Sequence, residues 1–167
     1  MLTGPQKEYL EKIPENSKAD IRPWDHESAK FAKNLVKKLE EFTGLEVFWG
    51  GSLALGIQGQ NDIDLYIFSE PGNFNANLPK VIPVLGEPTY VLEDKILWRV
   101  IKGGYKIDAS LGSKNLKGIQ NDMIFFDSLK TKPELLQEYV GLKQGDLSAR
   151  EYYQKKNEFY NRVIGLE

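Results

Sequence analysis

The sequence contains no cysteine and only one histidine, His26. The absence of cysteine excludes disulfides, zinc–thiolate sites and a cysteine nucleophile. His26 stands where a helix is expected to begin, far in sequence from the acidic residues discussed below, so we expect it at the surface or in a helix cap. No apolar run approaches the roughly 18 residues that a membrane span requires.

The 167 residues carry a formal net charge of −2, and 41% are hydrophobic and 28% charged. This profile is typical of a soluble globular protein, and the length favours one domain, with a core from about residue 21 to residue 164. The net charge gives no overall basic field, so nucleic-acid binding is possible but not indicated. Residues 1–20 are charged and lack the apolar core of a signal peptide, so we expect a cytoplasmic protein with no membrane partner.

Hydrophobic periodicity predicts an α+β fold in which a small mixed β-sheet is covered by helices. Apolar residues recur at helical spacing between Asp25 and the stop signal Gly44. Further helices are expected over 121–130, 134–142 and 148–164, and strands over 45–49, 62–68, 89–92, 96–101 and 105–111. Residues 70–77 are expected to form a loop, and two prolines within 78–85 argue against a long element there.

The central stretch joins a glycine-rich turn to a strand that begins with two acids. In the turn, Gly51 and Ser52 can present backbone N–H groups and a hydroxyl to a phosphate, because glycine lets the backbone approach closely. Asp62 and Asp64 stand two residues apart on a strand, so they point to the same face. Together they can hold a hard divalent cation against a bound phosphate.

A third acid, Asp108, is expected on a later strand. Lys106 and Ser110 share its strand face, which places Lys106 either within reach of a triphosphate or in solvent beside an acid. The sequence leaves these two roles of Lys106 open. Tyr66 follows the acid pair on the same face, where packing is favoured over stacking on a base.

This order of motifs resembles the nucleotidyltransferase superfamily with the polymerase-β-like fold. The shared pattern is an apolar strand, Gly51-Ser52, a gap of about ten residues, Asp62-Ile63-Asp64 and a third acid downstream. Within that superfamily the chain is similar to the GrpB-like family. That similarity covers the acid pair and six further segments, at 21–25, 126–129, 133–135, 138–139, 142–143 and 153–159.

The resemblance implies an enzyme that transfers an NMP group from a nucleoside triphosphate to an acceptor hydroxyl on a small molecule, a protein or an RNA. The cofactor implied is Mg²⁺ or Mn²⁺. The implied metal and catalytic residues are Asp62, Asp64 and Asp108, and the implied phosphate-binding residues are Gly51, Ser52 and Lys106. GrpB-like proteins generally have histidine where this chain has Asp108, and the aspartate restores the three carboxylates of the wider superfamily.

The alternative is a non-catalytic nucleotide- or RNA-binding module, or an interaction domain, on the same fold. Three clustered carboxylates argue against it, because without a metal they repel one another and cost stability. A kinase is disfavoured because the chain has no GxxxxGK[ST] phosphate loop. The sequence selects neither the base of the nucleotide nor the acceptor.

Overall fold

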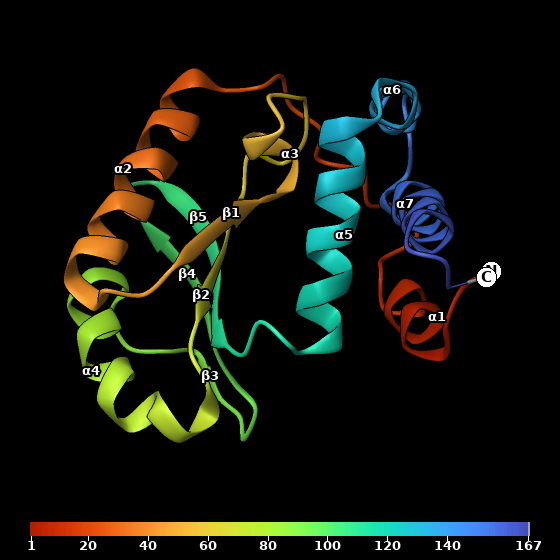
Figure 1. Cartoon of the computed structure of the whole chain (residues 1–167). Coiled ribbons are helices and arrows are strands. Elements are labelled where there is room, and N and C mark those ends of the chain that lie inside the picture. Colours follow the sequence, from red (N-terminus) through yellow and green to blue (C-terminus); the bar gives the residue numbers. More distant parts are fainter. Residues whose placement is uncertain (167) are drawn as a thin grey trace.

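The computed structural model describes residues 1–166, and it has α-helices on both faces of one β-sheet (Figure 1). The helices are α1 (Gly4–Glu11), α2 (His26–Thr43), α3 (Gly51–Ala54), α4 (Phe74–Leu85), α5 (Lys117–Thr131), α6 (Pro133–Gly141) and α7 (Ala149–Val163), with a 3-10 turn η1 (Pro71–Asn73) before α4. The strands are β1 (Val47–Gly50), β2 (Ile63–Phe68), β3 (Tyr90–Val91), β4 (Lys95–Lys102) and β5 (Tyr105–Gly112). The predicted α+β class with a mixed sheet is confirmed.

The five strands lie in the order β1-β2-β5-β4-β3. The β2–β5 pair is parallel and the other pairs are antiparallel, so the sheet is mixed. Its register aligns four residues in one row across four strands: Gly50 pairs with Asp64, Asp64 with Asp108, and Asp108 with Arg99. We call Gly50, Asp64, Asp108 and Arg99 the carboxylate row.

The apolar face of the sheet packs against α2 and α4, which lie together on one side in Figure 1. In α2 the buried stripe recurs at helical spacing, as predicted, and includes Ala32, Leu35 and Leu39. The Asp25 side chain caps the start of α2 by accepting a hydrogen bond from the Ser28 amide at 2.7 Å. The odd-numbered residues of β2 pack against this stripe. The even-numbered residues of β2 therefore face the opposite side of the sheet.

Helix α4 contradicts the loop expected over 74–77 and the expectation that two prolines exclude a long element over 78–85. It runs for 12 residues and contains Pro79 and Pro83. Each proline lacks the N–H group that would donate one helical hydrogen bond. Val81 and Val84, on the same helix, are fully buried. Their burial against α2 outweighs the local penalty of the prolines, an effect that local propensity rules do not capture.

The remaining helices form a second layer beyond the other face of the sheet, with α5 nearest to it and α6, α7 and α1 farther out (Figure 1). This helical layer has its own core, which includes Leu129, Tyr139 and Phe159. Leu55 and Ile57, from the segment after α3, pack against that core. The segment that carries the predicted turn is therefore anchored in the helical layer as well as in the sheet.

Among residues 1–166, no helix combines the length and the apolar character that crossing a membrane would need.

Candidate active site

The turn between β1 and α3 brings the backbone into contact with Asp64. Gly51 has φ +80°, a conformation that side-chain-bearing residues rarely adopt. A Cβ added to Gly51 would lie 2.1 Å from the Asp64 Oδ2 atom. A side chain fits at this position only if the Asp64 carboxylate or the turn moves, so glycine is required for this close contact.

The three acids predicted for the site lie on one face of the sheet, as expected from their spacing. Asp64 and Asp108 are neighbours in the carboxylate row, and Asp62 precedes them on the β2 side. Burial raises the pKa of Asp64 to about 7; Lys156 opposes this shift, while Asp62 and Asp108 add to it. Burial also raises the pKa of Asp62, with Lys106 opposing it. The site thus concentrates negative charge that is incompletely balanced.

Two basic side chains pair with the outer acids. Lys106 Nζ lies 3.3 Å from Asp62 Oδ2, and Arg99 Nε lies 3.6 Å from Asp108 Oδ1. No group of three or more His, Cys, Asp or Glu side chains in residues 1–166 is arranged closely enough to hold a metal ion. The chemistry of the donors nevertheless fits Mg²⁺ or Mn²⁺, because carboxylate oxygens are their preferred ligands and Asp64 is destabilised in its charged form.

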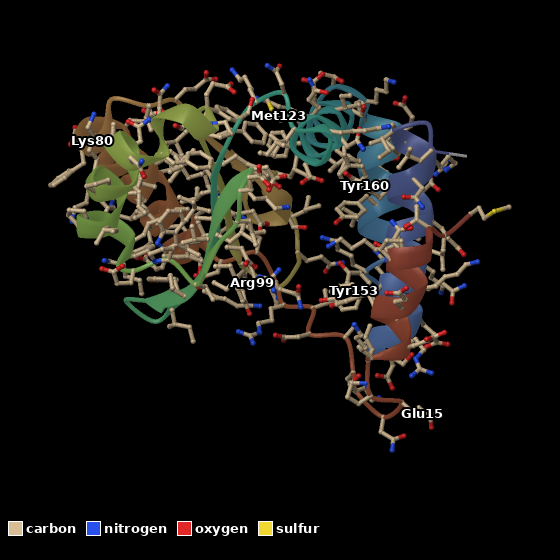
Figure 2. The ribbon with its side chains drawn as sticks, turned by 90° about the horizontal axis from the view of Figure 1, so that it is seen from below. Glu15, Lys80, Arg99, Met123, Tyr153 and Tyr160 are labelled. Carbon is tan, nitrogen blue, oxygen red and sulfur yellow. The ribbon has the colours of Figure 1, made fainter. Side chains whose placement is uncertain are left out.

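A cavity of about 320 Å³ opens beside the carboxylates, between the sheet and the helical layer. It is lined by Gly51 and Ser52 from the turn, by the acids, and by Asp122, Lys156 and Tyr160 from the helices. In Figure 2, Tyr153 and Tyr160 project from α7 toward the sheet. Lys106 lines a neighbouring cavity instead, with Asp62 between the two.

Lys143 holds Ser52 from the helical layer, a contact that the sequence did not reveal. Its Nζ atom donates to Ser52 Oγ at 2.5 Å and to the Gln58 carbonyl at 2.7 Å, and it lies 4.3 Å from the centre of the Tyr139 ring. Lys143 is only 3% exposed, and this burial, with Lys156 nearby, lowers its pKa to about 7. Ser52 therefore meets the cavity with its hydroxyl already oriented by a lysine.

Lys156 is the cation that the helical layer contributes to the cavity. The charge of Asp64 is one cause that raises the pKa of Lys156, although the largest cause is Tyr139. Sequence analysis did not identify Lys156, but a signal was present. It is a lysine on the helix face that otherwise carries Tyr152, Tyr153 and Tyr160 at helical spacing.

Asp122 is a fourth acid that the sequence analysis missed. It accepts hydrogen bonds from the hydroxyls of Tyr66 at 2.9 Å and Tyr160 at 2.7 Å, so it joins β2, α5 and α7 at the wall of the cavity. Burial raises the pKa of both tyrosines, with Asp122 contributing, and both therefore stay protonated as donors. Tyr66 also lies against Phe48, with ring centroids 5.7 Å apart, and it lines the cavity.

The buried Lys143 predicts a pH dependence of stability. Its native pKa of about 7 lies below the usual 10.5, so above pH 7 the unfolded chain binds more protons and raising the pH favours the native state. Between pH 7 and pH 9 we expect this group to add about 2 kcal/mol to the free energy of unfolding. Urea denaturation of Lys143→Met should lack this rise, whereas Lys130→Met, at an exposed position of α5, should retain it. Equal pH profiles for both variants would contradict the assignment.

No protein-family model matches the chain, and no curated protein sequence matches it. A structure of Cid1, described as an RNA terminal uridylyl transferase, aligns at a TM-score of 0.45 and 16% identity over 89% of this chain and 51% of that chain. A second, of Cid1 poly(U) polymerase with Mg and 3′-dATP bound, aligns at 0.43 and 17% identity over 89% and 51%. Polymerase beta from Leishmania infantum aligns at 0.41 and 15% identity over 96% and 84%. The chain spans about half the length of the Cid1 chains, and the function proposed below rests on its own geometry.

Proposed function

We propose that this protein is a metal-dependent nucleotidyltransferase of the polymerase-β-like superfamily, which moves an NMP group from an NTP to an acceptor hydroxyl. One observation carries the proposal: the Gly51 backbone lies against Asp64, and Asp64 lies beside Asp108 in the carboxylate row. A phosphate bound at the turn is therefore next to the acids. Within the superfamily we place the chain with the GrpB-like proteins, on the sequence resemblance.

The residues of the cavity have separate tasks in this reaction. Ser52 and the turn bind the phosphates, and Lys156 contributes positive charge from the helical layer. Asp62, Asp64 and Asp108 would hold Mg²⁺ or Mn²⁺, which when bound neutralises the charge that develops on the phosphoryl oxygens. The acceptor oxygen bonds to the α-phosphorus as the bond to pyrophosphate breaks, and Asp108 orients the attacking hydroxyl or accepts its proton.

Lys106 and Arg99 act as internal counter-ions for Asp62 and Asp108. Their ion pairs are the observation that favours the alternative, a nucleotide- or RNA-binding module without catalysis, because both acids already have partners. Both pairs involve exposed basic side chains, so a stronger cationic partner displaces them at little cost.

Isothermal titration with each NTP, in Mg²⁺, Mn²⁺ or EDTA, tests the proposal. We expect at least one NTP to bind, with affinity about tenfold or more higher in the presence of the metal. Incubation of that NTP with the protein and candidate acceptors should then release pyrophosphate. Metal-independent binding without pyrophosphate release would favour the non-catalytic module, and absence of NTP binding in every condition would contradict the transferase.

Lys156 and its neighbour Lys155 provide a matched pair of variants. Lys156 lines the cavity, whereas Lys155 is exposed on the outer face of α7. We expect Lys156→Met to weaken NTP binding about tenfold or more, because a charge-assisted contact with the phosphates is lost. Lys155→Met should bind NTP as the unmodified protein does. Equal NTP affinities of the two variants in calorimetry would show that Lys156 makes no important contact with the phosphates.

A further inference from the structure

A second cavity, of about 490 Å³, opens on the far side of the same carboxylates. It shares Asp64, Tyr66, Asp108 and Asp122 with the first cavity, so the acids form the wall between the two spaces. The first cavity contains the turn and Lys156, which suit a triphosphate. The second cavity contains neither, and it is placed to present a different group to Asp108.

The second cavity carries charges of both signs, with three cations and four acids, three of which belong to the shared wall. Lys95, Arg99 and Lys117 line it, and Asp94 is the acid among them that lies outside the shared wall. Arg99 side-chain atoms are 65% exposed, and its ion pair with Asp108 is long at 3.6 Å. Arg99 can therefore exchange its exposed pairing with Asp108 for a phosphate group at little cost, with Lys95 and Lys117 lining the same cavity.

An aromatic residue and an unpaired hydroxyl extend this surface along the sheet. One row beyond the carboxylates, the register aligns Tyr66, Ser110, Leu97 and Tyr90 across β2, β5, β4 and β3. Tyr90 is 52% exposed, and the Arg99 guanidinium lies 5.9 Å from its ring centre. Ser110 Oγ is buried at the cavity floor and has no hydrogen-bond partner within residues 1–166.

We propose that the acceptor is the 3′ end of a single-stranded nucleic acid, lying in the second cavity with its terminal hydroxyl at Asp108. The inference rests on the proposed function and names the acceptor class for the same site. Arg99, Lys95 and Lys117 contact the last phosphodiester groups, and a base stacks on Tyr90. An exposed aromatic ring beside cations favours a polynucleotide over a small acceptor or a protein, which are the outcomes that the experiment below separates.

The reaction on this acceptor balances without a further reactant. The 3′-hydroxyl oxygen forms a bond to the α-phosphorus of the NTP, and the bond from that phosphorus to the bridging oxygen of pyrophosphate breaks. The hydroxyl proton passes to Asp108 or to water, and pyrophosphate leaves through the first cavity. The product is the same strand, longer by one nucleotide and ending in a new hydroxyl.

Binding of oligonucleotides in EDTA tests the inference without requiring catalysis. Fluorescence anisotropy with 5′-labelled single-stranded RNA and DNA should show binding that weakens with salt. We expect the Arg99→Gln/Lys117→Gln double variant to bind about tenfold or more weakly, and Tyr90→Ala about tenfold more weakly. The control is Lys80→Gln, an exposed lysine on α4, which lies on the opposite side of the sheet (Figure 2) and should bind normally.

Binding of a 3′-phosphorylated oligonucleotide tests whether the end of the strand lies at the carboxylates. Its terminal dianion would face Asp64 and Asp108, so we expect weaker binding than with a 3′-hydroxyl end. Binding of RNA, of DNA or of both supports the inference if it depends on salt, on the substituted residues and on the 3′ end as described. The preferred nucleic acid identifies the sugar of the acceptor. NTP binding with metal but no oligonucleotide binding, or equal binding by the double variant and the Lys80 control, overturns the inference and leaves the proposed function intact. Absence of NTP binding overturns the proposed function itself.

Discussion

Asp64→Asn is expected to abolish nucleotide transfer and, at the same time, to make the protein more stable at pH 8. Activity should fall by about a thousandfold or more, because an amide cannot replace the charged oxygen at the centre of the site. Stability should rise because ionised Asp64 is unfavourable in the native protein, where burial raises its pKa to about 7. An opposite effect on activity and stability is typical of a residue placed for chemistry rather than for folding.

The sign of the stability effect depends on pH. The native pKa of Asp64 lies above the usual 3.8, so the native state binds more protons than the unfolded chain between about pH 4 and pH 7. Stability therefore falls as the pH rises through that window and stays low above it. Asn does not titrate, so the variant should gain about 2 kcal/mol over the unmodified protein at pH 8, or about 4–8 °C in melting temperature, and less at pH 5.

Thermal unfolding in EDTA at both pH values, with pyrophosphate release as the activity measurement, checks this result. Asp127→Asn, at an exposed position on α5, is the matched control and should change neither quantity. Full transfer activity in Asp64→Asn would refute the role of the carboxylate row. A stability gain of equal size at pH 5 and pH 8 would show that the gain does not come from the charge.

Gly51→Ala is expected to lose metal-dependent NTP binding and to lower the free energy of unfolding by about 2–4 kcal/mol. Two costs add together. The φ of +80° is unfavourable for alanine, at about 1 kcal/mol, and the new Cβ would lie 2.1 Å from Asp64 Oδ2. The carboxylate or the turn must move, and either movement separates the phosphate-binding backbone from the acids.

Gly56→Ala isolates the first cost, so the difference between the two glycine variants gives the second. Gly56 has a similar φ of +72°, but a Cβ there would meet no atom within 4 Å, so only the backbone penalty applies. Denaturant unfolding and NTP titration of both variants separate backbone strain from the clash. Adding Asp64→Ala to Gly51→Ala should recover part of the lost stability, since the clashing atom is removed. Equal losses in the two glycine variants would show that the contact with Asp64 is unimportant.

The parts of the fold that follow local patterns were predictable from the sequence. The alternation of Ile63, Leu65 and Ile67 with polar residues placed Asp62 and Asp64 on one face, and the structure keeps that arrangement. The helix stripe between the Asp25 cap and Gly44, and the strands expected over 96–101 and 105–111, are confirmed in the same way. In each case a period of 3.6 or 2, or a turn residue with positive φ, carries the information.

The parts of the site that come from tertiary packing were not predictable. Lys143 meets Ser52 across 91 positions of sequence, and no local spacing signals that contact. No local pattern marks Arg99 as part of the site, and only the pairing of β4 with β5 brings it to Asp108. The roles of Asp62, Asp64 and Asp108 as metal ligands, and of Gly51, Ser52 and Lys106 in phosphate binding, stay predictions. The variants above test Asp64 and Gly51.

The anchoring of the turn in two cores has a mechanical consequence. Leu53 is buried in the core of the sheet, whereas Leu55 and Ile57, a few positions later, pack in the core of the helical layer. The short segment between them therefore connects the core of the sheet to the core of the helical layer. Any tilt of α5–α7 against the sheet, such as one that admits a nucleotide or releases pyrophosphate, is transmitted directly to the Gly51-Ser52 turn. If the turn binds phosphate as proposed, opening the cavity would also move the phosphate-binding backbone.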